Sequence, residues 1–136
     1  MNEALEKDFL NLLPSLNHYI RVNTLAIKPD VLYNLLDGLN DIKLEKTALP
    51  YVFSININKP GALPEFKAGL IHVQSLSSCL VPLAFSSFSK YDIILDAAAS
   101  PGSKTTHLAA LMNNEGVIIA NDRKNRHKPL ISTLSR

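Results

Sequence analysis

The sequence has very little cysteine, no long apolar run and almost no net charge, and each shortage excludes a class of protein. Its one cysteine, Cys79, cannot form an internal disulfide, and no cysteine and histidine spacing suits a zinc site. No stretch of about 18 apolar residues is present, so the sequence predicts no membrane span. Fourteen basic and 12 acidic residues give a net charge of +2, too small a bias to establish a nucleic-acid partner.

The N-terminus also lacks the apolar segment of a signal peptide, because residues 1–8 are largely polar and acidic. We therefore expect a cytosolic protein. The 136 residues are 46% hydrophobic and 19% charged, which is globular composition, and the length suits one domain or two small ones.

The first part of the chain alternates helical and extended patterns. Apolar residues at helical spacing from Leu5 to Leu16 predict an opening helix that stops or bends just before Pro14. A helix beginning at Pro29 follows, and its predicted apolar face contains Val31, Leu32, Leu35, Leu36 and Leu39. Strands are predicted at 19–25, 42–47, 51–57 and 70–74, and a helix at 75–85, whose second half contains Pro82.

The pattern changes after the connector at 86–90, where we place a boundary between domains 1–85 and 86–136. A short apolar strand is predicted at 91–97, and a loop, a helix at 103–112 and a second buried strand at 117–120 come after it. The basic tail after Asp122 is expected to form a third helix. Strand, loop, helix, strand and acidic residue form the opening half of a doubly wound α/β fold.

The loop after the first of these strands is the candidate ligand site, because such loops line the carboxyl edge of a parallel sheet. Gly102 lets a ligand approach the backbone, and the next helix presents free N–H groups. Asp122 ends the next strand about 20 residues later, a spacing that suits a carboxylate accepting hydrogen bonds from ribose hydroxyls. Asp122 could equally be a helix N-cap.

Two phosphate-binding motifs fail at this loop. The dinucleotide fingerprint needs three glycines, and only Gly102 is present. The P-loop needs glycine directly before lysine, and Ser103 separates Gly102 from Lys104. These failures argue against binding of ATP or GTP and disfavour an unrelated nucleotide-binding protein.

The segment 96–106, Asp-Ala-Ala-Ala-Ser-Pro-Gly-Ser-Lys-Thr-Thr, closely resembles the cofactor loop of the Fmu/Sun (RsmB/RsmF-type, Nop/Sun) RNA cytosine-5 methyltransferases. Further similarity lies in the strand sequence at 20–25, the glutamine and small residues at 74–78, the segments 112–116 and 120–122, and the terminal Arg136. The resemblance covers nearly everything from Tyr19 to the end.

This resemblance implies a Rossmann-like methyltransferase domain preceded by a small α+β RNA-recognition-like subdomain. It implies S-adenosylmethionine as cofactor, structured RNA (rRNA or tRNA) as partner, methyl transfer to carbon 5 of a cytosine, and no metal. A cytoplasmic location follows, or a nucleolar one in a eukaryote. The implied cofactor residues are Ala98, Ala99, Ser100, Pro101, Gly102, Ser103 and Lys104, with Asp122 on the ribose. Ser100 departs from the family's more frequent alanine, and Arg126 lies off the family's arginine position and receives no role.

A catalytic cysteine is the missing part of this pattern. Enzymes of this kind attack carbon 6 of cytosine with a thiolate from a downstream Pro-Cys motif. Cys79 lies upstream of the loop in no such motif, so we expect it to be an ordinary helix residue and assign no catalytic residue. The segment after residue 90 has room for two strands and their helices but not for a full methyltransferase sheet. We therefore expect an N-terminal part of a methyltransferase, with apolar strand faces left exposed.

The alternative is a non-catalytic RNA-binding or assembly module that uses the first subdomain and the basic tail. That tail holds Arg123, Lys124, Arg126, Lys128 and Arg136, and it predicts either a phosphate-facing patch or a solvated helix face. The four histidines are scattered and show no metal-ligand spacing. His107 lies in the helix after the loop and could approach the ligand, but a solvated helix position is the prediction for it.

Overall fold

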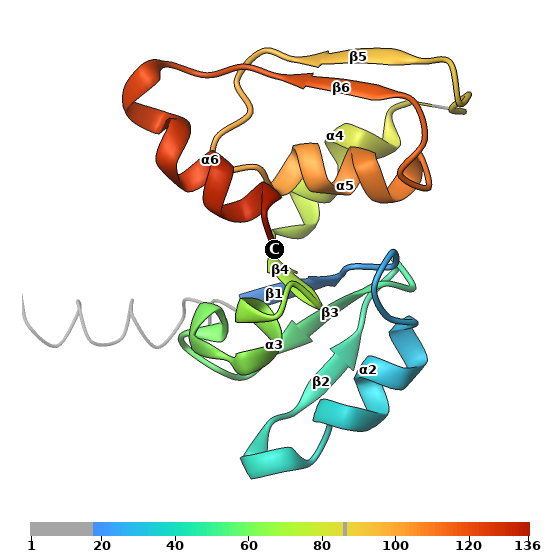
Figure 1. Cartoon of the computed structure of the whole chain (residues 1–136). Helices are drawn as coiled ribbons and strands as arrows, with labels where there is room; N and C mark the ends of the chain where they lie inside the picture. The colour runs from blue at the N-terminus through green and yellow to red at the C-terminus, as the bar shows by residue number, and fades with distance from the viewer. Residues whose placement is uncertain (1–17, 86) are drawn as a thin grey trace, which may run out of the picture.

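A computed structural model describes residues 18–85 and 87–136, which form two stacked layers (Figure 1). The first layer contains a four-stranded sheet, and the second contains a two-stranded sheet with helices against it. The predicted opening helix, from Leu5 to Leu16, lies outside the described residues.

The first layer follows the order β-α-β-β-α-β. Its strands lie in the order β2-β3-β1-β4, with every neighbouring pair antiparallel. The elements are β1 (His18–Val22), α2 (Pro29–Leu36), β2 (Leu44–Lys46), β3 (Val52–Ile55), α3 (Pro64–Lys67) and β4 (Ile71–Val73). The four strands confirm the predicted ones with shorter bounds, whereas α3 was not predicted.

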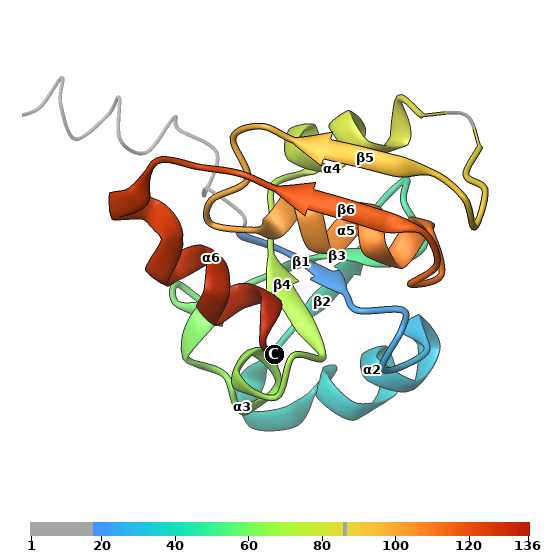
Figure 2. The same ribbon diagram turned by 45° about the horizontal axis from the view of Figure 1, so that its top comes forward.

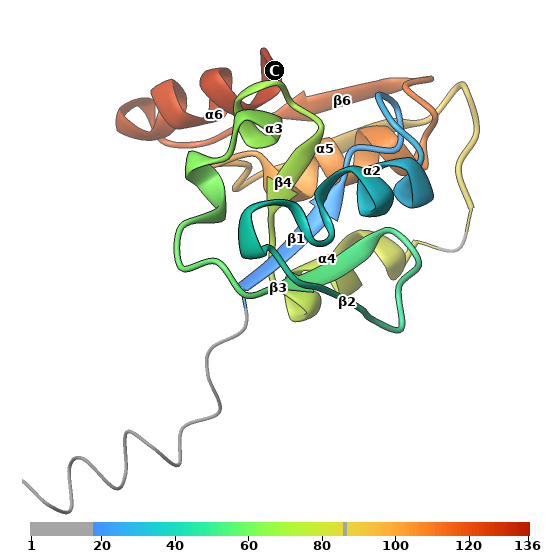
Figure 3. The same cartoon turned by 90° about the horizontal axis from the view of Figure 1, so that it is seen from below.

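One face of this sheet carries the apolar core. Side chains alternate along a strand, so Ile20 and Val22 of β1 point to this face, where they pack with Leu32 and Leu36 of α2. Figure 3 shows α2 beside this sheet. The rest of this cluster comprises Ile42, Leu44, Phe53, Ile55 and Ile71. Arg21, between Ile20 and Val22, points to the opposite face of the sheet, toward the second layer.

The helix α2 begins as the sequence predicts, with Lys28 extended and Pro29 in the first turn. Its apolar face is narrower than predicted, because Val31, Leu35 and Leu39 are about half exposed. This part of the prediction is wrong. A helix of two turns meets the sheet along one i, i+4 stripe, and the neighbouring apolar positions stay in solvent.

The second layer contains α4 (Leu76–Leu83), β5 (Ile93–Asp96), α5 (Ser103–Leu111), β6 (Val117–Ala120) and α6 (His127–Leu134). Strands β5 and β6 are parallel, and the β6 bounds agree with the predicted strand. The side chain of Ser75 caps α4 by accepting a hydrogen bond from the Ser78 N–H, and the helix ends just after Pro82. A short 3-10 turn, η3 (Lys124–Arg126), leads into α6.

The parallel pair is covered on one side only. Figures 1 and 2 show α4, α5 and α6 on the same side of β5 and β6. Ile94 and Ile118 are half-buried, whereas Ile93, Leu95, Val117 and Ile119 are 52–69% exposed. The prediction of exposed apolar strand faces is therefore confirmed for these residues.

Local turns set the end of β1 and the start of β6. Strand β1 stops at Val22 because Asn23 begins a turn, in which its carbonyl accepts hydrogen bonds from the N–H groups of Ala26 and Ile27. Gly116, predicted as a turn residue, has a φ of +75°, and a Cβ there would lie 2.7 Å from the carbonyl oxygen of Asp92.

In the parts of the chain that the structure describes, no helix is long and apolar enough to cross a membrane.

Candidate functional site

The loop between β5 and α5 is held by hydrogen bonds at both of its ends. The hydroxyl of Thr105 donates to the carboxylate of Asp96 at 2.7 Å, which joins the helix to the end of the strand. The N–H of Ala99 donates to the carbonyl oxygen of Asn121 at 2.9 Å, which joins the loop to the chain after β6. The loop therefore has one defined course along the carboxyl ends of both strands.

Gly102 is the N-cap residue of α5 and has a φ of +104°, a conformation that glycine adopts without strain. A Cβ there would lie 3.1 Å from the side chain of Thr133 and 3.3 Å from that of Leu130, both on α6. The glycine therefore permits close packing of α6, in addition to any ligand approach that the sequence predicts.

A cavity of about 190 Å³ lies against this loop. Six of the predicted cofactor residues line it, namely Ala98, Ala99, Ser100, Pro101, Ser103 and Lys104. The opposite wall comes from the end of β4 and the start of α4, with Val73, Gln74, Ser75 and Ser78. The cavity is smaller than a typical drug-sized pocket, so it suits one part of a larger ligand.

The walls of this cavity favour an anionic or polar ligand group. Lys104 is an exposed cation at its rim, and the first turn of α5 presents backbone N–H groups without helical partners. Gln74 is 4% exposed, and its Nε2 has no hydrogen-bond partner among the described residues. A buried donor without a partner is costly, and a ligand acceptor would satisfy it.

Asp122 lies beside the loop and not among the residues that line the cavity. Its carboxylate accepts hydrogen bonds from the backbone N–H of Ser100 at 2.8 Å and from that of Arg123 at 2.7 Å. These two bonds lower the pKa of Asp122 below its ordinary value, so the group stays ionised. A carboxylate has about four acceptor positions, which leaves capacity for a further donor. Its ribose role stays a prediction.

A buried polar layer lies between the four-stranded sheet and α5, and the sequence analysis did not find it. Arg21, Gln74, His72 and His107 are each 4% exposed or less. His107, predicted as a solvated position, is instead 3.2 Å from the hydroxyl of Tyr51, so that prediction is wrong. The helix α5 lies between the four-stranded sheet and the pair β5 and β6, so both of its faces are covered. The spacing of apolar residues along the helix does not reveal the second covered face.

Burial lowers the pKa of His72 to about 3 and that of His107 to about 4, with the charge of Arg21 as a second cause for both. Both rings are therefore neutral at neutral pH. Burial also lowers the pKa of Arg21 to about 10, which leaves the guanidinium charged. The only signal of this layer in the sequence is an arginine at an alternating position between two core residues.

Cys79 is fully buried on α4, and burial raises the pKa of its thiol. Cys79 lies on a helix as expected, and the raised pKa disfavours the thiolate; that it has no catalytic role stays a prediction. Within residues 18–85 and 87–136, no group of histidine, cysteine and acidic side chains is placed to hold a metal ion.

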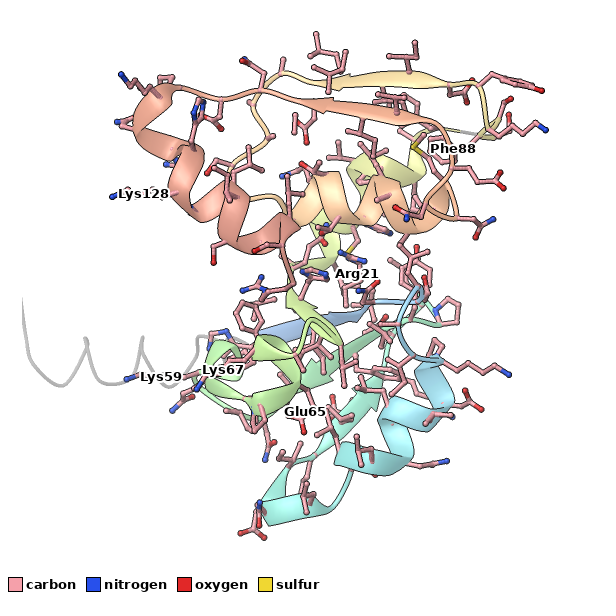
Figure 4. All side chains as sticks on the ribbon, in the orientation of Figure 1. Arg21, Lys59, Glu65, Lys67, Phe88 and Lys128 are labelled. Carbon is pink, nitrogen blue, oxygen red and sulfur yellow. The ribbon has the colours of Figure 1, made fainter. Side chains whose placement is uncertain are left out.

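The basic tail divides into two parts. Arg123, Lys124, Arg126 and Lys128 are exposed, and Figure 4 shows Lys128 at the outer side of α6. Arg136 instead stacks its guanidinium over the ring of Phe66 at 4.1 Å and joins the two layers. The exposed part is therefore the portion of the predicted patch that solvent, or a phosphate, can reach.

The fold and the loop together are those of one part of an α/β methyltransferase. A family model described as 16S rRNA methyltransferase RsmB/F matches residues 86–136. Ribosomal RNA small subunit methyltransferase F of Shewanella amazonensis is 39% identical over 125 residues, covering 86% of this chain and 26% of the relative. The tRNA (cytosine(49)-C(5))-methyltransferase of Pyrococcus abyssi is 39% identical over 135 residues, covering 96% of this chain and 43% of the relative.

Solved structures agree with these matches. A methyltransferase homolog protein from Pyrococcus horikoshii has a TM-score of 0.75 and 34% identity, covering 90% of this chain and 41% of that one. NSun6 from the same organism, crystallised with SFG, has a TM-score of 0.80 at 20% identity, covering 98% and 58%, and supports the fold alone. By the family model over residues 86–136, and by these relatives over most of its length, the chain is similar to the Fmu/Sun family of RNA cytosine-5 methyltransferases. It spans between about a quarter and somewhat under half of the length of these two curated relatives.

Proposed function

We propose that this chain supplies the cofactor-binding loop and an RNA-recognition-like subdomain of an S-adenosylmethionine-dependent RNA cytosine-5 methyltransferase. The observation that carries the proposal is the cavity between the loop at 98–104 and the junction of β4 and α4. Its lining combines small side chains, a helix N-terminus and a buried unpaired donor, which suits the polar end of an amino-acid-bearing cofactor.

The residues that would hold S-adenosylmethionine are those at 98–104, with Asp122 on the ribose. Bound there, the cofactor would supply the methyl group that is transferred to carbon 5 of cytosine. Lys104 and the N–H groups at the start of α5 favour its carboxylate, and the ionised Asp122 can accept from ribose hydroxyls. The family assignment supports this part of the proposal, and so does the SFG with which NSun6 was crystallised.

The proposed domain division is 1–85 and 86–136, and structured rRNA or tRNA is the proposed partner. The β-α-β-β-α-β order and the four-stranded antiparallel sheet support an RNA-recognition-like unit, and the start of the family model at residue 86 supports the division. Helix α4 nevertheless packs on α5, so it belongs physically to the second layer. A cytoplasmic location is part of this proposal, since the relatives named above modify rRNA and tRNA.

One consequence concerns how RNA would be bound. In RNA-recognition domains, bases stack on an open sheet face. Here α2 covers one face, and the other lies against α5, where Arg21 and His107 are buried. RNA contact would therefore use exposed basic side chains, such as Lys124 and Lys128, rather than the sheet.

The alternative, a non-catalytic RNA-binding or assembly module, is favoured by that same exposed basic segment and by the burial of Cys79, which raises the pKa of its thiol. A tritiated-methyl transfer assay with total RNA tests whether Cys79 is a catalytic residue or a buried helix residue without a role in methyl transfer. We expect no transfer by this chain alone, because no described residue can supply a thiolate to carbon 6. Transfer that disappears in Cys79→Ser would show that Cys79 is catalytic after all.

Titration calorimetry tests the cofactor proposal directly. We expect the chain to bind S-adenosylmethionine and not ATP, and Asp122→Ala to weaken that binding about tenfold, through loss of a charge-assisted hydrogen bond. Asp30→Ala is the matched control, because Asp30 is an exposed acid on α2. Tighter binding of ATP than of S-adenosylmethionine would contradict the proposal, and an unchanged affinity in folded Asp122→Ala would make Asp122 a structural residue.

A further inference from the structure

Arg21 is the largest fully buried side chain of the described residues, and it lies on the interface between the two layers (Figure 4). It comes from β1, beside His72 of β4 and Val52 of β3 in the sheet register. The titratable groups that interact with it include Cys79 and Tyr51, both uncharged at neutral pH because burial raises their pKa values, and no carboxylate of the described residues is among them. A buried cation without an acid is costly, and packing alone would be served better by an apolar side chain.

The guanidinium makes two hydrogen bonds, which diverge to different elements. Its Nε donates to Oε1 of Gln74 at 2.8 Å, and its Nη2 donates to Oγ1 of Thr106 at 2.9 Å. Gln74 stands between β4 and α4, and Thr106 is in the first turns of α5. One side chain of the first layer thus joins Gln74, which lines the cavity, to Thr106 of α5, the helix whose first residues, Ser103 and Lys104, belong to the other wall.

On the α5 side, the connection continues into the loop. The hydroxyl of Thr106 lies 2.9 Å from the carbonyl oxygen of Gly102, to which it can donate while it accepts from Arg21. The backbone N–H of Thr106 donates to the same carbonyl oxygen at 2.9 Å. Arg21 therefore contacts the loop through a single intervening hydroxyl.

On the α4 side, the contact sets the orientation of the Gln74 amide. Since Nε of Arg21 is a donor only, it must face the amide oxygen, and this leaves Nε2 as the free end. That Nε2 is the buried donor without a partner among residues 18–85 and 87–136, and Gln74 lines the cavity.

We propose that Arg21 is a positioning residue of the cofactor cavity, which acts through Gln74 and Thr106 to fix the amide and the loop for the ligand. The identity of the ligand as S-adenosylmethionine rests on the proposed function, whereas the positioning of the loop does not. Arg21 itself does not line the cavity. The cost of its burial is offset in part by its hydrogen bonds to Gln74 and Thr106.

The test compares four substitutions with a matched control in the full chain. Arg21→Met removes both donors, Arg21→Lys keeps the charge but not the forked geometry, and Thr106→Val removes the hydroxyl that Thr106→Ser retains. Tyr51→Phe is the control, because it removes another hydrogen bond between the layers, to His107, that does not lead to the loop. Urea unfolding of every variant establishes that it is folded and how far it is destabilised.

The first readout is hydrogen exchange without ligand. We expect Arg21→Met and Thr106→Val to exchange the amides of Ser100, Gly102 and Thr106 about tenfold faster than wild type, because local opening of the loop becomes easier. Tyr51→Phe and Thr106→Ser should leave these amides within about twofold of wild type. If Arg21→Met does not fold, Thr106→Val and Arg21→Lys carry the comparison.

The second readout is affinity for S-adenosylmethionine by calorimetry. We expect a loss of about tenfold in Arg21→Met and a smaller loss in Thr106→Val, with less than additive effects in the double variant because the two act through one connection. Unchanged loop exchange in folded Arg21→Lys and Thr106→Val would overturn the positioning role, whatever the ligand. If the Arg21 and Thr106 variants exchange the loop amides faster but the wild-type chain does not bind S-adenosylmethionine, the positioning role of Arg21 is supported and the proposed function is contradicted.

Discussion

The two sheets of this protein meet water in opposite ways. The four-stranded sheet has an apolar face under α2 and a polar face under α5, and both are closed. The two-stranded sheet has its half-buried face toward α5, while Ile93, Leu95, Val117 and Ile119 face solvent. The first sheet therefore contains a complete core, whereas the second shows the face that a doubly wound fold covers with a further helical layer.

The buried polar side chains of the protein include a group in the layer between the four-stranded sheet and α5. The interface between the layers contains buried Arg21, His72 and His107, with the apolar side chain of Val52 beside Arg21 in the sheet register. Polar groups in a buried layer need defined partners, so they fix the relative position of two layers more narrowly than apolar contacts do. In the proposal above, Arg21 of this layer also helps to position the loop at 98–104.

The largest expected effect comes from one substitution made in each sheet. Ile71→Ala in β4, where the side chain is 0% exposed, should lower the free energy of unfolding by about 2–5 kcal/mol, because it leaves a cavity in the core. Ile93→Ala in β5, where the side chain is 69% exposed, should lower it by less than about 0.5 kcal/mol. Urea unfolding measures both, and equal losses would mean that the two sheets are not packed as differently as described.

The next effect concerns pH and the layer between the sheets. His72 and His107 have folded pKa values of about 3 and about 4, below the unfolded value of about 6.5, so they are protonated more readily in the unfolded chain. Their contribution to stability is complete above about pH 6.5 and is lost as the pH falls toward 4. Each histidine should lower the free energy of unfolding by about 1.4 kcal/mol per pH unit in that window.

Unfolding at several pH values between 4 and 8 checks this slope. His107→Gln and His72→Gln should each lower the free energy of unfolding. Each should also reduce the slope of that free energy against pH by the contribution of one proton. A wild-type slope that neither substitution reduces would mean that other groups, such as carboxylates, cause the loss of stability in acid.

The smallest effect on stability is expected at the uncovered face. Leu95→Glu and Ile119→Lys should change the free energy of unfolding by no more than about 0.5 kcal/mol, because both side chains already face solvent. The same substitutions should reduce the fluorescence of the dye 8-anilinonaphthalene-1-sulfonate, which binds exposed apolar surface. Asn34→Glu on α2 adds charge without removing apolar surface and should leave the fluorescence unchanged.

Much of the second layer could be predicted because its signals are local. The strand at 117–120 is a continuous apolar run, and Gly116 and Asn121 mark its ends. The loop at 98–102 is bounded by an apolar strand and a helical pattern, so its position along the chain did not depend on distant residues. The family resemblance came from the same short segment.

The burial of Arg21, His72 and His107 could not be predicted in this way. In the sequence, Arg21 is one polar residue in an alternating strand, and such positions most often face water. His107 sits in a helix of mixed composition, in which no stripe marks a second buried side. Each becomes buried only because two elements that lie 85 positions apart, at Arg21 and Thr106, come into contact.

The sequence by itself therefore determined the order of elements, the place of the loop, the strand-end position of Asp122 and the apolar character of the uncovered strands. Periodicity and turn chemistry act over a few residues, and these features need no more than that. Only the tertiary structure decided that α4 and the end of β4 form the second wall of the cavity, that Cys79 is buried, and that a charged side chain joins the sheet to the loop. Those features depend on which faces of separate elements meet, and the free energy of burying a face is a property of the pair and not of either segment alone.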